Sequence, residues 1–258
     1  MEERRISAGG GEITYLAAGD KDNPIILYIH GNLGCRLWYR GVMNVPGYRT
    51  LAPDMPNFSE SSPTGDFSMV GYARSLEAFM EVVEGGHPRR GVTIVGHSLG
   101  GVVAMELAAR AELPIEKMLL VSPGPIEGLV TPKEQYPVLE TYRTNRNLLK
   151  TALATVVPTL DDVDVLEELV DEGMRMHPGA FLGHPDALTK ADYTDRLGKL
   201  PFPSMIIRGN ADRLITQEMC TRTAWHLGAV YRELYGVGHS PMVEAPGLFL
   251  SVLKDFVG

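Results

Sequence analysis

One serine of this chain lies in a setting that could turn its hydroxyl into a nucleophile. Ser98 is the centre of the Gly-His-Ser-Leu-Gly stretch at Gly96–Gly100, which follows the apolar run Val92–Val95 and precedes a helix-forming run, Val102–Ala109. A sharp turn between a strand and a helix holds such a hydroxyl clear of the sheet, and it needs small residues at its outer positions. The dipole of the following helix favours negative charge near the serine. The pattern predicts that Ser98 is a nucleophile.

A serine hydroxyl needs a base, and the base needs an acid to orient it. His239 follows Gly238 in a loop just after the last predicted strand, and Asp212 lies just past the predicted strand 204–207. Loops at the carboxyl ends of parallel strands meet at one edge of a sheet, where ligands bind. The chain order of the three residues also suits a nucleophile exposed at the top of a sheet. We therefore predict that His239 is the general base and Asp212 its orienting acid.

Other polar residues compete for these roles, but their positions suit them less. His97 belongs to the turn of Ser98 and is expected to point away from the nucleophile, and three acidic residues have no strand end before them. The remaining histidines lie in helical or linker contexts, where we expect structural roles. These competitors are Asp192, Asp195, Glu244, His87, His177, His184 and His226.

The oxyanion that forms during acyl transfer needs preorganised hydrogen-bond donors. The turn itself supplies one, the backbone N–H of Leu99. A second donor should come from the loop after another central strand, and residues 30–34 directly follow the apolar run Ile25–Ile29. We assign this donor to the N–H of Asn32, with Leu33 as the alternative, and we expect His30 to order the loop rather than to act as a base.

The elements that must position these residues alternate between apolar strands and amphipathic helices. This alternation is typical of a parallel sheet with helices on both faces, joined by right-handed crossovers. The predicted strands are 25–29, 49–52, 91–95, 117–121, 204–207 and 229–235, and the predicted helices are 69–84, 99–110, 217–227 and 246–257.

The alternation stops between residues 125 and 200, where no strand-like run occurs. About 75 residues without a strand are too long for one crossover, so we predict an inserted helical cap over 125–200 on a core of 1–124 and 201–258. One of its helices carries seven acidic residues, which we interpret as a solvated face. Its predicted helices are 131–145, 146–157, 160–174 and 178–189, and the acidic residues are Asp161, Asp162, Asp164, Glu167, Glu168, Asp171 and Glu172.

Composition excludes several classes of protein. The 258 residues suit one large α/β domain, and 44% hydrophobic with 22% charged residues excludes a disordered chain. The net charge is −8 and no basic run exceeds a pair, so no nucleic-acid partner is expected. No apolar run approaches the roughly 20 residues of a bilayer span, and the charged N-terminus lacks the apolar core of a signal peptide. We expect a cytoplasmic protein without a membrane partner.

Cofactors and metals are not expected either. No Cys/His cluster has ligand spacing, and no Gly-x-Gly-x-x-Gly follows a strand. Cys35 and Cys220 do not form a disulfide framework, which favours a reducing compartment. The expected partner is a small ester-like molecule, and the sequence leaves a homodimer open.

Together these motifs resemble the α/β-hydrolases of the capped, single-domain type. The resemblance covers nearly the whole chain and depends on His30–Gly31 with Trp38, Gly96–Gly100, Gly209–Asp212 and Gly238–His239. By this resemblance Ser98, His239 and Asp212 form a catalytic triad, and Asn32 and Leu99 supply the oxyanion donors. The loop Asp54–Ser61 departs from the family pattern, because Asn57 and Ser59 stand where many relatives have glycine. Asn57 can adopt the left-handed conformation, but Ser59 replaces glycine less easily, which weakens any transfer of substrate preference.

The resemblance implies a serine hydrolase of carboxylic esters that forms an acyl-enzyme. The same triad also serves carbon–carbon hydrolases, lactonases and perhydrolases, and these remain alternatives. A serine nucleophile disfavours the dehalogenase and epoxide hydrolase branches, which use aspartate. A remoter alternative is a ligand-binding protein that keeps the fold without catalysis.

Overall fold

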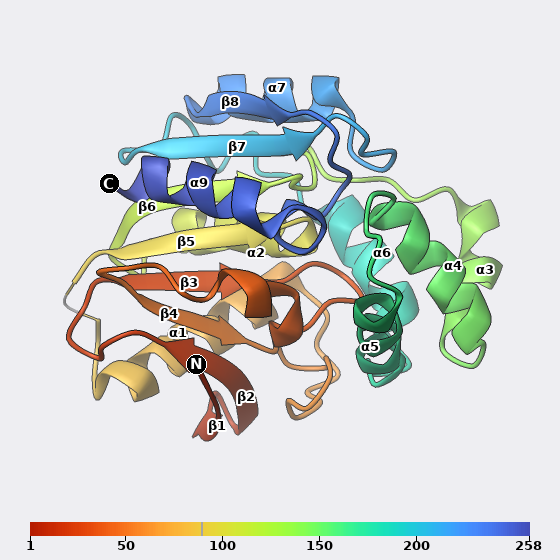
Figure 1. Ribbon diagram of the computed structural model, residues 1–258, viewed down its shortest axis with the longest axis horizontal. Helices are drawn as coiled ribbons and strands as arrows, with labels where there is room; N and C mark the ends of the chain where they lie inside the picture. The colour runs from red at the N-terminus through yellow and green to blue at the C-terminus, as the bar shows by residue number, and fades with distance from the viewer. Residues whose placement is uncertain (89) are drawn as a thin grey trace.

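The structure is a computed structural model that describes residues 1–88 and 90–258. The described residues form an eight-stranded sheet in the order β1-β2-β4-β3-β5-β6-β7-β8 (Figure 1). β2 pairs antiparallel with β1 and β4, whereas the other neighbouring strands are parallel. The predicted mostly parallel sheet is confirmed. The strands are β1 (Glu2–Ala8), β2 (Gly11–Ala18), β3 (Ile25–Ile29), β4 (Arg49–Pro53), β5 (Val92–His97), β6 (Ile115–Val121), β7 (Ser204–Gly209) and β8 (Val230–Leu234).

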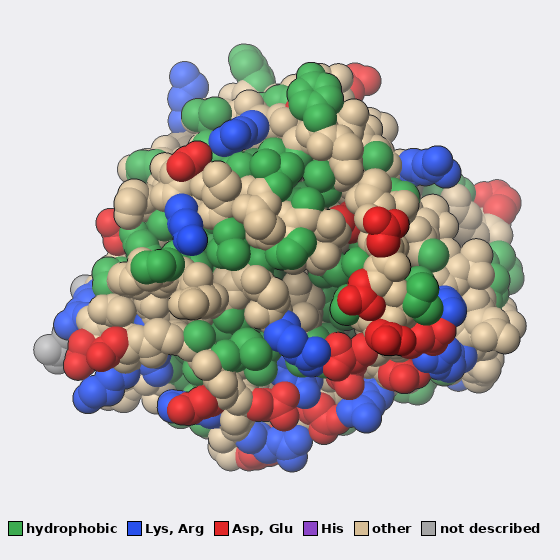
Figure 2. Space-filling model, in the orientation of Figure 1, with side chains coloured by type: hydrophobic (Ala, Val, Ile, Leu, Met, Phe, Trp, Pro, Cys, Tyr) green, Lys and Arg blue, Asp and Glu red, His purple; other side chains and the backbone are tan. Residues whose placement is uncertain are grey.

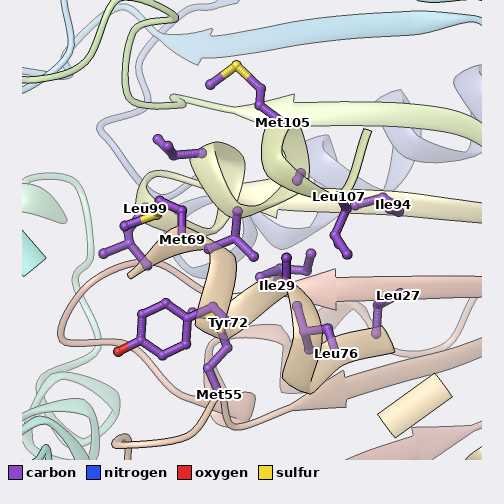
Figure 3. Packing of buried hydrophobic residues seen from close by; sticks show 14 of the residues in the cluster. Leu27, Ile29, Met55, Met69, Tyr72, Leu76, Ile94, Leu99, Met105 and Leu107 are labelled. Carbon is purple, nitrogen blue, oxygen red and sulfur yellow. The ribbon is translucent and has the colours of Figure 1, made fainter. Parts of the chain in front are cut away.

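Helices cover both faces of this sheet, as predicted. The burial of the central strand β3 illustrates this. All five of its residues are buried, because successive side chains point to opposite faces and both faces are covered. Leu27 and Ile29 pack in the core that contains Leu76 of α1 (Figure 3), whereas Tyr28 packs in the core shared with η1 and α9. One core contains α1 (Met69–Glu84), α2 (Leu99–Arg110) and α7 (Gln217–Leu227), and the other contains η1 (Arg36–Val42), α8 (Pro241–Glu244) and α9 (Pro246–Val257).

The four helices predicted for the core, α1, α2, α7 and α9, have the predicted bounds. Local signals explain this agreement at α1. The Ser68 side chain accepts a hydrogen bond from the N–H of Gly71, and Gly85 ends the helix with a φ of 69°. A serine cap and a left-handed glycine satisfy backbone groups that a helix end leaves without partners.

The N-terminal hairpin of β1 and β2 was not among the predicted strands. Its turn consists of Gly9 and Gly10, whose φ angles are 60° and 86°. A two-residue turn with both φ values positive matches the twist of an antiparallel pair, and glycine adopts it without strain. Two adjacent glycines between alternating runs were therefore a usable signal for this hairpin.

Residues 125–200, which we name the helical segment, join β6 to β7. Within the described chain no strand lies between Val121 and Ser204, and the helices lie beyond the carboxyl ends of the parallel strands (Figure 1). The predicted helix 131–145 is replaced by a short turn, η2, and the shorter α3. The elements are η2 (Lys133–Gln135), α3 (Tyr136–Tyr142), α4 (Arg146–Val156), α5 (Val163–Met174) and α6 (Ala180–Lys190). No helix in the described residues is long and apolar enough to span a bilayer.

Most of the acidic residues predicted to form a solvated face on α5 are exposed or half-exposed, but one of them is buried. Figure 2 shows side chains of both charges gathered over α5 and the N-terminal hairpin. Glu172, predicted as part of this face, is instead buried. Its carboxylate accepts a hydrogen bond from Ser59 and lies 3.7 Å from Nη1 of Arg36. A buried carboxylate requires such partners, because burial without them is costly.

Candidate active site

The turn between β5 and α2 holds Ser98 in a strained conformation. Its φ is 53° and its ψ is −116°, a region that non-glycine residues rarely adopt. Ser98 N–H donates to Val121 O over 3.0 Å, and Ser98 O accepts from Gly101 N–H over 3.0 Å, so both sides of the turn are tied down. A Cβ on Gly96 would lie 2.5 Å from Gly100 O. A Cβ on Gly100 would collide with the backbone oxygen of Ile29, so both positions flanking the serine require glycine.

Asp212 and His239 meet at the carboxyl ends of β7 and β8. His239 Nδ1 lies 2.8 Å from Asp212 Oδ2, and the two side chains are 4% and 0% exposed. The other carboxylate oxygen accepts from the N–H groups of Leu214 and Ile215 over 2.8 and 3.0 Å. Burial by itself would raise the pKa of Asp212, but the hydrogen bonds from His239, Ile215 and Leu214 lower it below its ordinary value. The carboxylate therefore stays ionised and orients the ring.

No hydrogen bond of the described residues joins the ring of His239 to the hydroxyl of Ser98. The residue before it makes the contact instead. The ring centroids of His97 and His239 are 4.8 Å apart, and His97 Nε2 donates to His239 O over 3.2 Å. Because this nitrogen is engaged, His97 supports the backbone of His239. Burial, together with His239, lowers the pKa of His97 well below its ordinary value, so the ring is neutral.

The loop after β3 brings Asn32 to the same edge of the sheet. A Cβ on the neighbouring Gly31 would lie 3.0 Å from Cβ of Ser98, so only glycine allows this approach. Asn32 Oδ1 accepts from the N–H of Leu33 over 3.0 Å. That bond occupies the N–H of Leu33, the alternative oxyanion donor. The N–H of Asn32 forms no hydrogen bond within residues 1–88 and 90–258. The N–H of Leu99 is the first of α2 and has no partner within the helix.

A histidine of the helical segment fixes the side chain of Asn32. His184 of α6 is fully buried, and its Nδ1 lies 2.7 Å from Asn32 Oδ1. Its Nε2 lies 2.6 Å from the hydroxyl of Tyr72, and its ring stacks on Phe58 with centroids 4.8 Å apart. Since an amide oxygen only accepts, Nδ1 donates, and Nε2 accepts from Tyr72. Burial lowers the pKa of His184 to about 3, which keeps this neutral form.

His30 orders the same loop through hydrogen bonds of both its ring nitrogens. Its Nε2 accepts from the N–H of Met55 over 3.0 Å, so its Nδ1 carries the proton and donates to Gly31 O over 2.9 Å. Burial lowers its pKa to about 4. Both nitrogens are therefore engaged, as expected for a residue that orders the loop.

The Asp54–Ser61 loop adopts the glycine-like conformation despite its sequence. Asn57 has a φ of 71° and Ser59 a φ of 46°. Left-handed backbone costs a residue such as serine about 1–2 kcal/mol. The Ser59 hydroxyl offsets this cost, because it accepts from Arg36 over 3.0 Å and donates to Glu172. Hydrogen bonds to charged groups contribute about 1.5–3 kcal/mol.

Sequence reasoning missed the role of His184, which it placed among the structural histidines. His184 and Asn32 are 152 residues apart, and no local motif relates them. A usable signal would have been a second sequence in which both positions change together. The described residues also contain no group of three or more His, Cys, Asp or Glu side chains arranged for a metal ion.

Comparison with known proteins relates the chain to hydrolases. The profile of the Alpha/beta hydrolase family matches residues 26–252. A 2-hydroxy-6-oxononadienedioate/2-hydroxy-6-oxononatrienedioate hydrolase of Pseudomonas sp is 25% identical over 96% of this chain and 92% of its own length. A 2-hydroxy-6-oxo-6-phenylhexa-2,4-dienoate hydrolase of Comamonas testosteroni is 24% identical over 95% and 91%.

Solved structures share the architecture. An esterase from Exiguobacterium antarcticum superposes with a TM-score of 0.86 at 17% identity and covers 98% of both chains. An enol-lactonase from Burkholderia xenovorans superposes with a TM-score of 0.85 at 20% identity, covering 98% of this chain and 99% of its own. Likeness at such low identity concerns the fold alone, and it confirms the predicted fold.

Proposed function

We propose that this chain, which belongs to the alpha/beta hydrolase family, is a serine hydrolase that cleaves carboxylic esters through an acyl-enzyme. One observation carries the proposal: His239 Nδ1 lies 2.8 Å from the buried carboxylate of Asp212, at the sheet edge that also holds Ser98. The strained turn of Ser98 supports the same reading, because strain of this kind is kept where a nucleophile must be exposed.

In the proposed mechanism, Asp212 keeps the proton of the ring on Nδ1 and leaves Nε2 to act as the base. Nε2 of His239 takes the hydroxyl proton as Ser98 attacks the carbonyl carbon of the ester. The protonated ring then gives this proton to the departing alcohol, and an acyl-enzyme remains. Water activated by the same ring releases the acid. The hydrogen bond between nucleophile and base is often long before substrate binds and shortens in the complex.

The N–H groups of Asn32 and Leu99 are the proposed donors to the oxyanion. Asn32 is supported by the bond that occupies the N–H of Leu33, its alternative. The hydrogen bond from His184 to the Asn32 side chain further limits the freedom of the loop. Donors held in place in advance cost no reorganisation during the reaction.

The helical segment acts, in this proposal, as a cap over the substrate. Its helix α6 contacts the oxyanion loop through His184, and its helices lie at the edge of the sheet that holds the triad (Figure 1). Burial keeps the histidines around Asn32 neutral, and the nearby Arg36 is bonded to Asp54, Glu3 and Ser59. These surroundings favour an uncharged ester.

The test compares Ser98→Ala with the wild type in hydrolysis of a p-nitrophenyl ester. We expect turnover to fall by at least about 10³-fold, because removing the nucleophile leaves only binding and the oxyanion donors. Ser75→Ala on α1 is a matched control and should retain full activity. A fluorophosphonate should label Ser98 of the wild type. An active Ser98→Ala protein would exclude the triad, and a wild type that is neither labelled nor active would indicate a ligand-binding protein.

A second candidate is hydrolysis of a carbon–carbon bond next to a ketone, which the same triad could perform. It is supported by the two relatives named above, which align over more than nine-tenths of this chain and are hydrolases of oxo-dienoates. Parallel assays on short-chain esters, a lactone and a vinylogous diketone, at equal enzyme concentration, separate these candidates. A value of kcat/KM at least about 100-fold higher for the diketone than for any ester would favour the second candidate.

A further inference from the structure

The loop that carries His239 is bonded to the helical segment through one carboxylate. Glu244, at the end of the four-residue helix α8, turns its side chain back toward this loop. Its Oε2 accepts from the N–H of Gly238 over 3.0 Å, and its Oε1 accepts from the N–H of Ser240 over 2.8 Å. The two donors flank His239 on either side, so the carboxylate fixes the backbone on which the base is mounted.

The same carboxylate also binds the linker between α4 and α5 in the helical segment. The N–H and the hydroxyl of Thr159 donate to Glu244 Oε2 over 3.1 and 2.6 Å. A third bond joins the two segments directly, because the N–H of His239 donates to Val156 O over 3.2 Å. The helical segment and the histidine loop are thus joined at His239 itself, through Val156 of α4, and through Glu244.

Close packing accompanies these bonds. A Cβ on Gly238 would lie 2.5 Å from Glu244 Oε2 and would also collide with the ring of Pro158. Within the described chain Glu244 forms no ion pair with Lys or Arg, so backbone N–H groups and one hydroxyl solvate its charge. Hydrogen bonds to an ionised acceptor are shorter and stronger than those between neutral groups.

We propose that Glu244 is a positioning residue that couples the base His239 to the Thr159 linker of the helical segment. The inference rests on the proposed function, since it assumes that His239 acts on Ser98. Movement of the linker would carry the histidine loop with it, so the placement of the helical segment sets the distance between base and nucleophile. A displacement of about 1 Å in a catalytic group can cost about 100-fold in rate.

The sharpest test uses Thr159, which is outside the triad and 80 residues before His239 in sequence. Thr159→Val keeps the shape and the backbone N–H but removes the hydroxyl, whereas Thr159→Ser keeps the hydroxyl. We expect Thr159→Val to lower kcat roughly tenfold with KM within about twofold, because one hydrogen bond to a charged acceptor is lost. Thr159→Ser should match the wild type. Rates are normalised to the sites that a fluorophosphonate labels, so that loss of folded protein does not count.

Glu244→Gln is the second test. Both carboxylate oxygens of Glu244 accept hydrogen bonds, so the NH2 group of the glutamine must face a donor in either orientation of the amide. We expect kcat to fall about 100-fold and fluorophosphonate labelling to slow in parallel. Glu218→Gln on α7, where the glutamate is exposed, is the matched control. The double variant Thr159→Val/Glu244→Gln should be no slower than Glu244→Gln alone, since both changes act on one network.

The outcomes separate this inference from the proposed function. A wild type without labelling or turnover overturns the proposed function and the inference with it. An active wild type whose Thr159→Val variant keeps its kcat per labelled site, even with a lower melting temperature, overturns the coupling alone. If Glu244→Gln does not fold, the comparison of Thr159→Val with Thr159→Ser decides the question.

Discussion

The core and the helical segment bury their residues in different ways. All residues of β3 are buried, and both faces of the sheet are covered. In contrast, α3 buries none of its residues, and α4 buries only Leu149 and Leu153. The facing surfaces of α4 and α5 carry exposed ion pairs, such as that of Arg146 with Asp171 at 2.7 Å. Such pairs contribute little to stability.

This difference assigns different tasks to the two regions. The core presents the groups proposed to do chemistry, Ser98, Asp212 and His239, beyond the carboxyl ends of β5, β7 and β8. The helical segment contacts the core through apolar side chains, such as Phe181 and Leu169, and through a few polar contacts, made by His184 and Thr159. Helices that bury few apolar side chains, such as α3 and α4, open at lower free energy than a packed core. Changes in the two regions should therefore differ in size and in kind.

The largest effect is expected from the core. Asp212→Asn keeps the shape of the side chain but removes the charge that orients His239, and kcat should fall roughly 10⁴-fold with little change in KM. Steady-state kinetics on a p-nitrophenyl ester measures this. A loss below tenfold would mean that Asp212 does not orient the base and would remove the contrast between core and helical segment.

A smaller effect is expected from the contact of the helical segment with the oxyanion loop. His184→Phe keeps an aromatic ring against Phe58 but loses the bond to Asn32, so we expect kcat to fall about tenfold, less than the loss of an oxyanion donor itself. His177→Phe, in the same segment, should leave kcat unchanged. If both variants behave alike, the contact with Asn32 is unimportant for turnover.

The pH dependence of stability tests whether His184 is neutral in the folded protein. Burial lowers its pKa to about 3 from an ordinary 6.5, so between these values the unfolded chain binds a proton that the folded protein does not. Stability therefore falls as the pH falls, by about 2 kcal/mol per such histidine between pH 7 and pH 5. His30, with a pKa of about 4, adds to this loss.

His184→Phe should remove one of these contributions. Urea unfolding at pH 7 and pH 5 is expected to show a loss about 2 kcal/mol smaller in the variant than in the wild type. The comparison uses the change with pH, so a constant destabilisation by the substitution cancels. Equal losses in the two proteins would mean that His184 titrates normally.

The smallest effect is expected from the ion pairs between α4 and α5 in the helical segment. Glu167→Gln breaks half-exposed ion pairs with Arg146 and Lys150. Kinetics and thermal unfolding should both match the wild type, because water and salt screen such pairs. A clear loss of kcat would show that these ion pairs also control the site, which would contradict the division of tasks between the core and the helical segment.

Local sequence determined much of this protein. The apolar run 25–29 predicted β3, helical periodicity predicted α1, and the small residues around Ser98 predicted a sharp turn. Each of these features depends on neighbouring residues, whose periodicity and backbone preferences act over a few positions. The pair of glycines between β1 and β2 was a signal of the same local kind that was overlooked.

Tertiary structure alone decided the contacts between distant segments. The bond of His184 to Asn32 and the bonds of Thr159 to Glu244 join residues 152 and 85 positions apart. The burial of Glu172 on an otherwise acidic face was decided in the same way, by Ser59 and Arg36 of the core. Such contacts follow from how whole helices pack on the sheet, and a helix of the same sequence could bury a different face against another core. The pattern along the chain therefore identifies the groups suited to chemistry, and packing decides which residues hold them in place.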